Sequence, residues 1–206
     1  MELATAIETR TSVREFTSEP LNPDDIREII RLAGLAPSIN SYQPWKYYII
    51  SNHEVLHKMA DTITNEIEKM PESESRMAKT LKNQAAWFST FFRDAPMLIA
   101  LAGRSYETDL EKGVRMTHDE LERIKNFPDL QSAGASIQNL LLAATEKGYG
   151  TCWMTGPLYA RNDLERILGI ENPWQLLSFV VIGKTTKKEQ KGRIKRNLAD
   201  EMVVID

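Results

Sequence analysis

The amino-acid sequence predicts an α+β fold built as one domain over residues 1–206. Short apolar or aromatic segments have the length and composition of strands, and longer segments show helical periodicity. The helical segments outnumber the strands and do not alternate with them as in a doubly wound sheet, which favours helices layered over a sheet. A single domain is expected because domains commonly contain roughly 100 to 200 residues.

The composition indicates a globular protein without an electrostatic reason to bind nucleic acid or an anionic membrane. Hydrophobic residues make up 42% of the chain and charged residues 27%, and the net charge is -3. The longest aliphatic run, residues 97–102, is far shorter than the roughly 20 residues of a membrane-spanning helix. Because the charged N-terminus lacks the apolar segment of a secretory signal, we expect a cytoplasmic protein.

The first predicted helix covers residues 22–35. Asn22 is a capping residue, Pro23 suits the first helical position, and two acidic residues follow in the first turn. Gly34 and Pro37 end the segment. One helical face carries the apolar residues Ile26, Ile29, Ile30 and Ala33.

Residues 45–50, 97–102 and 176–182 are predicted as buried central strands. The first segment is aromatic and β-branched, and the other two are almost continuously apolar. Further helices are expected over 53–69, 84–92, 130–147 and 160–168.

Residues 70–82 and 104–128 are polar and irregular, so we expect both to leave the core. The second is the expected lid or substrate-facing segment, because long loops of compact domains are often functional.

Cysteine and histidine usage gives no support for a metal centre. Cys152 is the only cysteine, which excludes an intramolecular disulfide and predicts a buried thiol. His53 and His57 share a helical face but lack the glutamate of an H-E-x-x-H motif, and His118 is isolated in the sequence. We interpret His53 and His57 as surface residues.

Four segments carry residues suited to binding a small ligand, although each also has a plain structural interpretation. RTSVR at 10–14 contains two guanidinium groups that suit phosphate oxygens, or it is a solvated basic helix end. PSINSYQPW at 37–45 offers polar groups on a stiff loop. GYGTCWMTGP at 148–157 predicts a short strand between two turns, where glycine allows close approach of a ligand or simply a tight turn. KGR at 191–193 lies in a basic C-terminal segment.

In this order and at these separations, the four segments resemble the nitroreductase-like family of FMN-dependent oxidoreductases over essentially the whole chain. The resemblance implies an α+β sandwich with a central, mostly antiparallel sheet flanked by helices. It also implies a domain-swapped homodimer in which the C-terminal tail wraps the partner subunit and FMN lies at the interface. The apolar residues 202–205 fit such a docked tail.

The resemblance also implies roles for particular residues. Arg10 and Ser12 would lie at the phosphate and ribityl end of FMN, with Arg14 nearer the pyrimidine edge. Lys191 and Arg193 would join Arg10 on the phosphate.

The remaining implied positions concern the flavin ring. The partner subunit would contribute Pro37, Ser38 and Ile39, Asn83 would offer an amide to the pyrimidine edge, and backbone groups of Thr155 and Gly156 would face flavin N5. This chain departs from the family pattern in one respect, because Ser41 stands where the family often has asparagine.

The function implied by the resemblance is reduction of small electrophilic acceptors, such as nitro compounds or quinones, with NADH or NADPH as a transient electron donor. Because a flavin stores the hydride between half-reactions, ping-pong kinetics are expected, and no side chain is assigned as general acid or base. Two alternatives stay open: another flavin reaction, such as reductive dehalogenation or oxygen-dependent flavin chemistry, and flavin binding without NAD(P)H turnover. The sequence identifies neither the acceptor nor the preferred nicotinamide.

Overall fold

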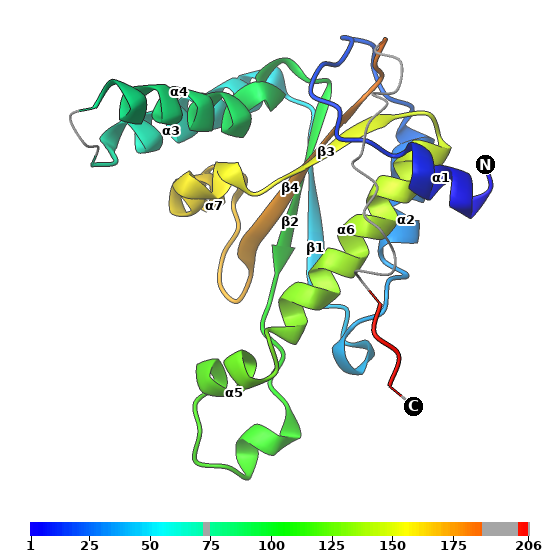
Figure 1. Ribbon diagram of the computed structural model, residues 1–206, viewed down its shortest axis with the longest axis vertical. Helices are drawn as coiled ribbons and strands as arrows, with labels where there is room; N and C mark the ends of the chain where they lie inside the picture. The colour runs from blue at the N-terminus through cyan, green and yellow to red at the C-terminus, as the bar shows by residue number, and fades with distance from the viewer. Residues whose placement is uncertain (72–74, 187–201, 206) are drawn as a thin grey trace.

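An antiparallel sheet crosses the centre of the protein and has helices on both faces (Figure 1). The computed structural model describes residues 1–71, 75–186 and 202–205. The strand order is β1-β2-β4-β3, and every neighbouring pair runs antiparallel. The strands are β1 (Trp45–Ile50), β2 (Met97–Gly103), β3 (Gly150–Met154) and β4 (Gln175–Gly183).

Helices account for most of the remaining structure. The α-helices are α1 (Leu3–Thr9), α2 (Pro23–Ala33), α3 (His53–Lys69), α4 (Arg76–Thr90), α5 (His118–Ile124), α6 (Pro128–Glu146) and α7 (Arg161–Leu168). Short 3-10 helices are η1 (Ile39–Ser41), η2 (Phe91–Asp94), η3 (Asp109–Lys112) and η4 (Gly156–Ala160). No helix in the described part of the chain is both long enough and apolar enough to cross a membrane.

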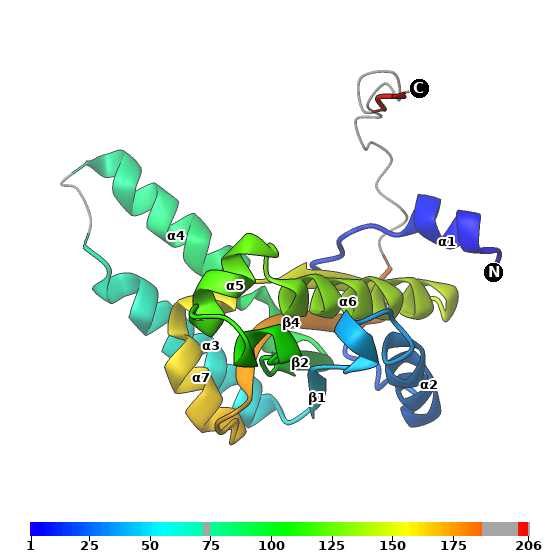
Figure 2. The ribbon, with the colours of Figure 1, turned by 90° about the horizontal axis from the view of Figure 1, so that it is seen from below.

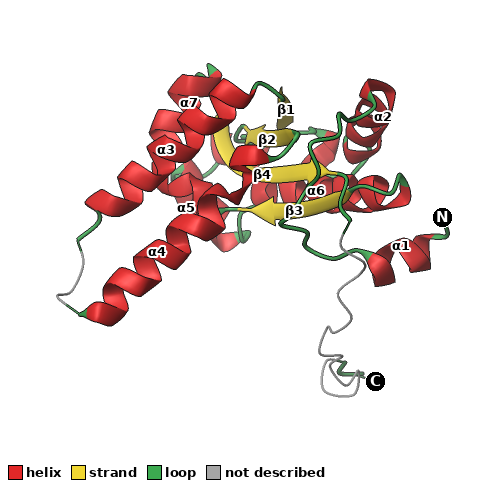
Figure 3. Ribbon diagram, turned by 90° about the horizontal axis from the view of Figure 1, so that it is seen from above, coloured by secondary structure: helices red, strands yellow, loops and turns green. Residues whose placement is uncertain are grey.

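The core is split by the sheet into two layers, which explains the continuous apolar runs of β2 and β4. Helices α2 and α6 cover one face, while α3 and α7 cover the other (Figures 2 and 3). Successive strand residues point to opposite faces, and both faces are buried here. Leu98 therefore packs in the α3 layer, whereas the adjacent Ile99 packs in the α6 layer.

The predicted α+β fold and most predicted elements are confirmed. The side chain of Asn22 accepts a hydrogen bond from the backbone of Asp24 at the start of α2, with Pro23 in the first position. Helix α6 ends before Gly148, whose φ of 80° is a left-handed conformation that favours glycine. Cys152 is buried, as expected from its being the only cysteine.

Three predicted details were wrong or incomplete. β1 lies at the edge of the sheet, whereas the sequence predicted a central strand. Helix α4 begins at Arg76, inside the predicted irregular segment 70–82, and its residues Met77 and Leu81 are exposed, so the sequence pattern shows no single apolar stripe. Helix α1 was not predicted, since it is short and buries only Ala6.

The predicted excursion at 104–128 does leave the core and projects beyond one end of the sheet, where Figure 1 labels α5. It contains η3 and α5 and is not irregular throughout. Each of these helices starts with a capping box, formed by Thr108 with Glu111 and by Thr117 with Glu120.

Candidate functional site

The N-terminal segment that carries the RTSVR motif is fixed beside β3. Ser12 forms a parallel bridge with Thr151, and the backbone N–H of Val13 donates to the Thr151 carbonyl over 2.9 Å. A Cβ added to Gly150 would lie 2.9 Å from the Val13 side chain, so glycine allows this close approach. The motif is thereby held against β3, the strand within the GYGTCWMTGP segment.

This attachment brings two of the predicted ligand-binding segments to one hollow of about 420 Å³. Arg10 and Ser12 line it from the N-terminal side, and Thr155 lines it from the end of β3. The other lining residues are Gln138, Leu141 and Trp153. A guanidinium group, hydroxyl groups, an amide and an aromatic ring therefore surround a single open space.

Trp153 is a fixed aromatic wall of this hollow. Its side chain is 44% exposed although it lies on a strand. Its indole N–H donates to the hydroxyl of buried Ser178, and that hydroxyl donates to the Met154 carbonyl over 3.2 Å. These bonds orient the ring, so its apolar surface is available to a flat ligand.

The turn after β3 is held in place by a glycine. A Cβ on Gly156 would come within 2.4 Å of the hydroxyl oxygen of Ser89, a buried residue of the last turn of α4. The Thr155 carbonyl accepts the backbone N–H of Leu158 over 3.0 Å and starts η4. Because no larger residue fits at 156 without displacing Ser89, the backbone at this turn is closely fixed.

Arg14, the last residue of the RTSVR motif, does not line the hollow and lies against α4 instead. Its guanidinium carbon is 5.6 Å from the centre of the Phe88 ring on α4, a cation–π distance. Burial raises the pKa of the Cys152 thiol, while the charge of Arg14 and a hydrogen bond with Ser12 partly oppose that shift. The thiol is therefore a packed core group next to the motif, in surroundings that disfavour its charged form.

The PSINSYQPW loop does not line this hollow in the single chain. The backbone N–H of Ile39 donates to Ser132 near the start of α6 over 3.1 Å, and the Ser38 hydroxyl accepts the N–H of Gln43 over 2.9 Å. Three loop residues have positive φ: Asn40 (45°), Ser41 (56°) and Gln43 (51°). Pro37, Ser38 and Ile39 thus lie on a tightly bent loop against the N-terminal half of α6.

Of the other predicted site residues, Asn83 is exposed on α4 and does not line the hollow. Lys191 and Arg193 lie outside the described residues. Sequence reasoning missed Gln138, Leu141 and Trp153. Gln138 is one of several polar residues of α6 and has no local signal that sets it apart, and the sequence does not show that Trp153 is exposed on its strand.

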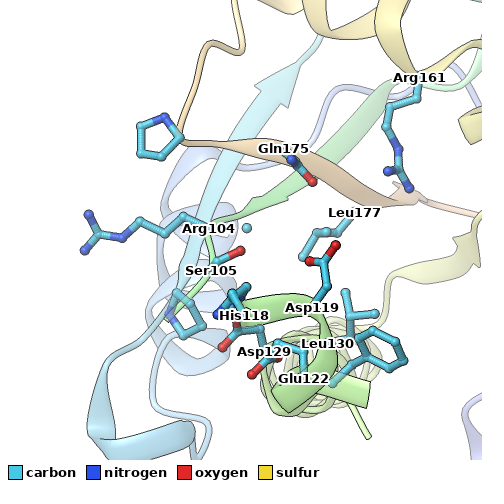
Figure 4. A pocket seen from close by; sticks show the side chains of 14 residues that line it. Arg104, Ser105, His118, Asp119, Glu122, Asp129, Leu130, Arg161, Gln175 and Leu177 are labelled. Atoms are coloured by element: carbon cyan, nitrogen blue, oxygen red, sulfur yellow. The ribbon is translucent and has the colours of Figure 1, made fainter. Parts of the chain in front are cut away.

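A second cavity, of about 230 Å³, lies at the other end of α6, between the excursion and the ends of β2 and β4 (Figure 4). Its wall includes the titratable residues His118, Asp119, Glu122 and Asp129, together with Arg104 and Arg161. A hydrogen bond from the backbone of Thr108, assisted by His118, lowers the pKa of Glu111 to about 2. Burial instead raises the pKa of Asp129.

The fold of these elements is nitroreductase-like: an α+β sandwich in which helices flank an antiparallel sheet. The chain belongs to the Nitroreductase family, whose model matches residues 7–184.

Two relatives align with nearly the whole chain. MhqN of Bacillus subtilis strain 168, which carries the name of an NAD(P)H nitroreductase, is 24% identical over 203 residues and 98% of each chain. An iodotyrosine deiodinase of Hydra vulgaris is 27% identical over 204 residues, covering 97% of this chain and 71% of the relative.

Solved structures show the same architecture over the full length. A BluB-like flavoprotein from Clostridium difficile 630 is 28% identical, with a TM-score of 0.89 and complete coverage of both chains. A nitroreductase with bound FMN from Desulfitobacterium hafniense DCB-2 is 17% identical, with a TM-score of 0.74 and complete coverage of both chains. The second similarity concerns the fold alone.

Proposed function

We propose that the protein is an FMN-dependent oxidoreductase that uses NADH or NADPH to reduce small electrophilic acceptors such as nitro compounds or quinones. The observation that supports this best is the hollow in which Arg10 and Ser12 meet Thr155 and Trp153. These residues come from separate motifs of a chain that belongs to the Nitroreductase family.

The residues around the hollow fit FMN in their chemistry. A guanidinium group and a hydroxyl suit a phosphate, and the apolar surfaces of Leu141 and Trp153 suit a planar ring. When bound, FMN supplies the redox chemistry, because its ring accepts and releases a hydride at N5. The protein supplies position and electrostatics.

Each site residue then has a binding role. Arg10 and Ser12 hold the phosphate and ribityl end, with Lys191 and Arg193 as further phosphate ligands, and Arg14 lies toward the pyrimidine edge. Asn83 is a candidate amide for the same edge. Backbone groups at Thr155 and Gly156 face N5, where a backbone donor does not titrate as the charge on the ring changes. The close contact of Gly156 with Ser89 keeps these groups at a constant position.

We propose a homodimer in which Pro37, Ser38 and Ile39 of one chain complete the site of the other. In a single chain this loop packs near Ser132 and does not line the hollow, so a complete flavin site needs a second copy. Several large apolar side chains are exposed, which supports an interface: Trp87, Phe88, Trp153 and the tail residues Met202, Val203, Val204 and Ile205. The tail would dock on the partner subunit.

An absorption spectrum tests the cofactor and the donor. The purified protein is expected to show flavin bands that bleach under anaerobic conditions when NADH or NADPH is added without acceptor. Turnover with several acceptor concentrations should give parallel double-reciprocal lines, because donor and acceptor use one site in turn. A protein without flavin that does not bind added FMN contradicts the proposal, and bound flavin that no nicotinamide reduces indicates flavin binding without NAD(P)H turnover.

Reductive dehalogenation is a second candidate, favoured by the similarity to iodotyrosine deiodinases along almost the whole chain. Halogenated and halogen-free phenols of the same size distinguish the two reactions. Halide release after chemical reduction of the flavin, with no turnover of nitro compounds or quinones, would support dehalogenation.

A further inference from the structure

We propose that His118, Glu122 and Asp129 bind one divalent transition-metal ion, of the class of Zn²⁺, on the wall of the second cavity. The potential ligand atoms of these three residues all lie within 4.8 Å of one another, and all three residues line the same cavity. Figure 4 shows their side chains gathered below Ser105.

Two structural elements bring the three residues together. His118 and Glu122 are four residues apart on α5 and therefore share a helical face, while Asp129 lies in the first turn of α6. Imidazole nitrogen and carboxylate oxygen are both ligand types that zinc uses in proteins, and three protein ligands with an open fourth position are typical of its non-structural sites. Bonds of about 2.0 to 2.2 Å place tetrahedral ligand atoms about 3.3 to 3.6 Å apart, so small side-chain rotations close the cluster around an ion.

His118 is held in the orientation of a metal ligand. Its Nδ1 lies 2.9 Å from Oε2 of Glu111. The other oxygen of Glu111, Oε1, accepts from the backbone N–H and the hydroxyl of Thr108, over 2.7 and 3.0 Å. Histidine ligands commonly donate one ring nitrogen to a carboxylate in this way, which leaves the other nitrogen, here Nε2, for the ion.

The two carboxylates of the cluster are incompletely paired inside the protein. Oδ2 of Asp129 accepts the Tyr106 N–H over 2.9 Å, but Oδ1 is buried and has no hydrogen-bond partner among the described residues. Glu122 is only 5% exposed. Its Oε1 lies 2.7 Å from Nζ of Lys125, yet neither atom forms a hydrogen bond of acceptable geometry in the described part of the chain. Buried charges of this kind are normally paired or coordinate a metal.

The surrounding charges leave room for a cation. Three carboxylates, from Glu111, Glu122 and Asp129, lie around the imidazole of His118 and the ammonium group of Lys125. The imidazole binds a metal ion in its neutral form, so Lys125 is the one cation of this group. Arg104 also lines the cavity, but its guanidinium stacks over the rings of Tyr42 and Trp174, at 4.7 and 5.1 Å, and it points away from the cluster in Figure 4. An ion on the cavity wall would keep coordination positions open toward the space beside Arg161 and Gln175.

Zinc titration of the full-length protein, after chelator treatment and dialysis, tests the proposal. Isothermal titration calorimetry should show one Zn²⁺ per chain for the wild type and no saturable binding for His118→Asn. Glu111→Gln leaves the three ligands in place but should weaken binding about 10- to 100-fold, as loss of the partner of a histidine ligand does. His57→Asn, which changes an exposed histidine paired with Asp94, is the matched control and should bind like the wild type.

Circular dichroism shows whether each variant is folded, independently of metal and flavin binding. Zinc should also raise the melting temperature of the wild type and not that of His118→Asn, because a ligand that binds only the folded state stabilises it. The proposal is overturned if the wild type does not bind Zn²⁺ under these conditions, or if folded His118→Asn binds as well as the wild type. It is also overturned if His57→Asn, and not His118→Asn, abolishes Zn²⁺ binding. None of these results depends on the flavin reaction.

Discussion

The two hollows along α6 differ in how their polar groups are satisfied. The hollow beside β3 combines Arg10 and Ser12 with an exposed aromatic wall, Trp153, and the loop proposed to complete it lies elsewhere on the same chain. The cavity under the excursion contains the buried carboxylate of Glu122 and the half-buried Asp129, which has an oxygen without a hydrogen-bond partner among the described residues. The first arrangement suits a large planar anion and a second subunit, whereas the second suits a small cation within one chain.

The largest effect is expected from reversing a charge at the first hollow. Arg10→Glu replaces a proposed phosphate ligand with a repelling carboxylate. Loss of one charged hydrogen bond costs about 1.5 to 3 kcal/mol, so FMN affinity should fall by more than about 10- to 150-fold. Arg193→Glu, outside the described residues, is expected to act in the same way. Arg27→Glu, at an exposed pair with Asp24, is the control. If purified Arg10→Glu has the flavin content of the wild type, the FMN phosphate does not bind at this hollow.

The next largest effect concerns the turn at the end of β3. Gly156→Ala places a Cβ about where the Ser89 hydroxyl lies, and overpacking of this kind typically lowers the free energy of unfolding by about 1 to 3 kcal/mol. The variant should also lose flavin. Gly134→Ala on α6 is the matched control, since its Cβ would meet Trp153 at an ordinary 3.7 Å. Because alanine favours a helix, the control should gain about 0.5 to 1 kcal/mol. Urea denaturation measures both values, and equal stability of the two variants would contradict the assigned contact.

A smaller effect is expected at the second cavity. Asp129→Asn keeps an acceptor for the Tyr106 N–H but removes one of two neighbouring negative charges. In the presence of chelator, the free energy of unfolding should stay within about 1 kcal/mol of the wild type. In the presence of Zn²⁺, the variant should show none of the stabilisation of the wild type. A loss of several kcal/mol with chelator would mean that the Asp129 charge itself stabilises the fold.

The smallest effect is a pH dependence at the C-terminal end of α6. A hydrogen bond from Tyr149, followed by the ion pair with Lys147, holds the pKa of Asp25 below its usual 3.8. The folded state therefore binds this proton less readily than the unfolded state. The contribution of Asp25 to stability is present above pH 3.8 and is lost as the pH falls through the lowered pKa. Asp25→Asn should flatten this acid loss.

Urea midpoints between pH 5 and pH 2 measure the effect. Tyr149→Phe should flatten the acid loss in part, since it removes the largest cause of the shift. Asp24→Asn, at the neighbouring exposed carboxylate, is the control and should keep the steep loss of the wild type. A wild-type profile in Asp25→Asn would show that this network does not control acid stability.

Much of the fold was predictable because its signals are local. The capping residue Asn22 and the stripe of Ile26 and Ile29 located α2, and apolar runs located β2 and β4. The start of α4 was missed because its exposed Met77 and Leu81 obscure a one-sided pattern. The edge position of β1 was missed because its composition does not distinguish an edge from a central strand in a sheet covered on both faces.

The sequence predicted the motif residues of the candidate flavin site but did not predict all the residues that line the hollow. Arg10, Ser12 and Thr155 were singled out as parts of recognisable segments, and the structure places them around one hollow. Trp153 lies inside one of those segments, yet its orientation depends on tertiary contacts: its indole N–H donates to Ser178, 25 residues away, and its ring lies beside Gly134 of α6.

The sequence by itself determined the family, the main helices and strands, and the residue types suited to a phosphate, because these are encoded in short-range periodicity and ordered motifs. Only the tertiary structure decided that His118 and Glu122 of α5 meet Asp129 of α6, and that the Pro37 to Ile39 loop lies away from the hollow of its own chain. Both outcomes depend on where the chain turns between elements. Such contacts are set by packing against the sheet, and no single segment contains enough information to specify them.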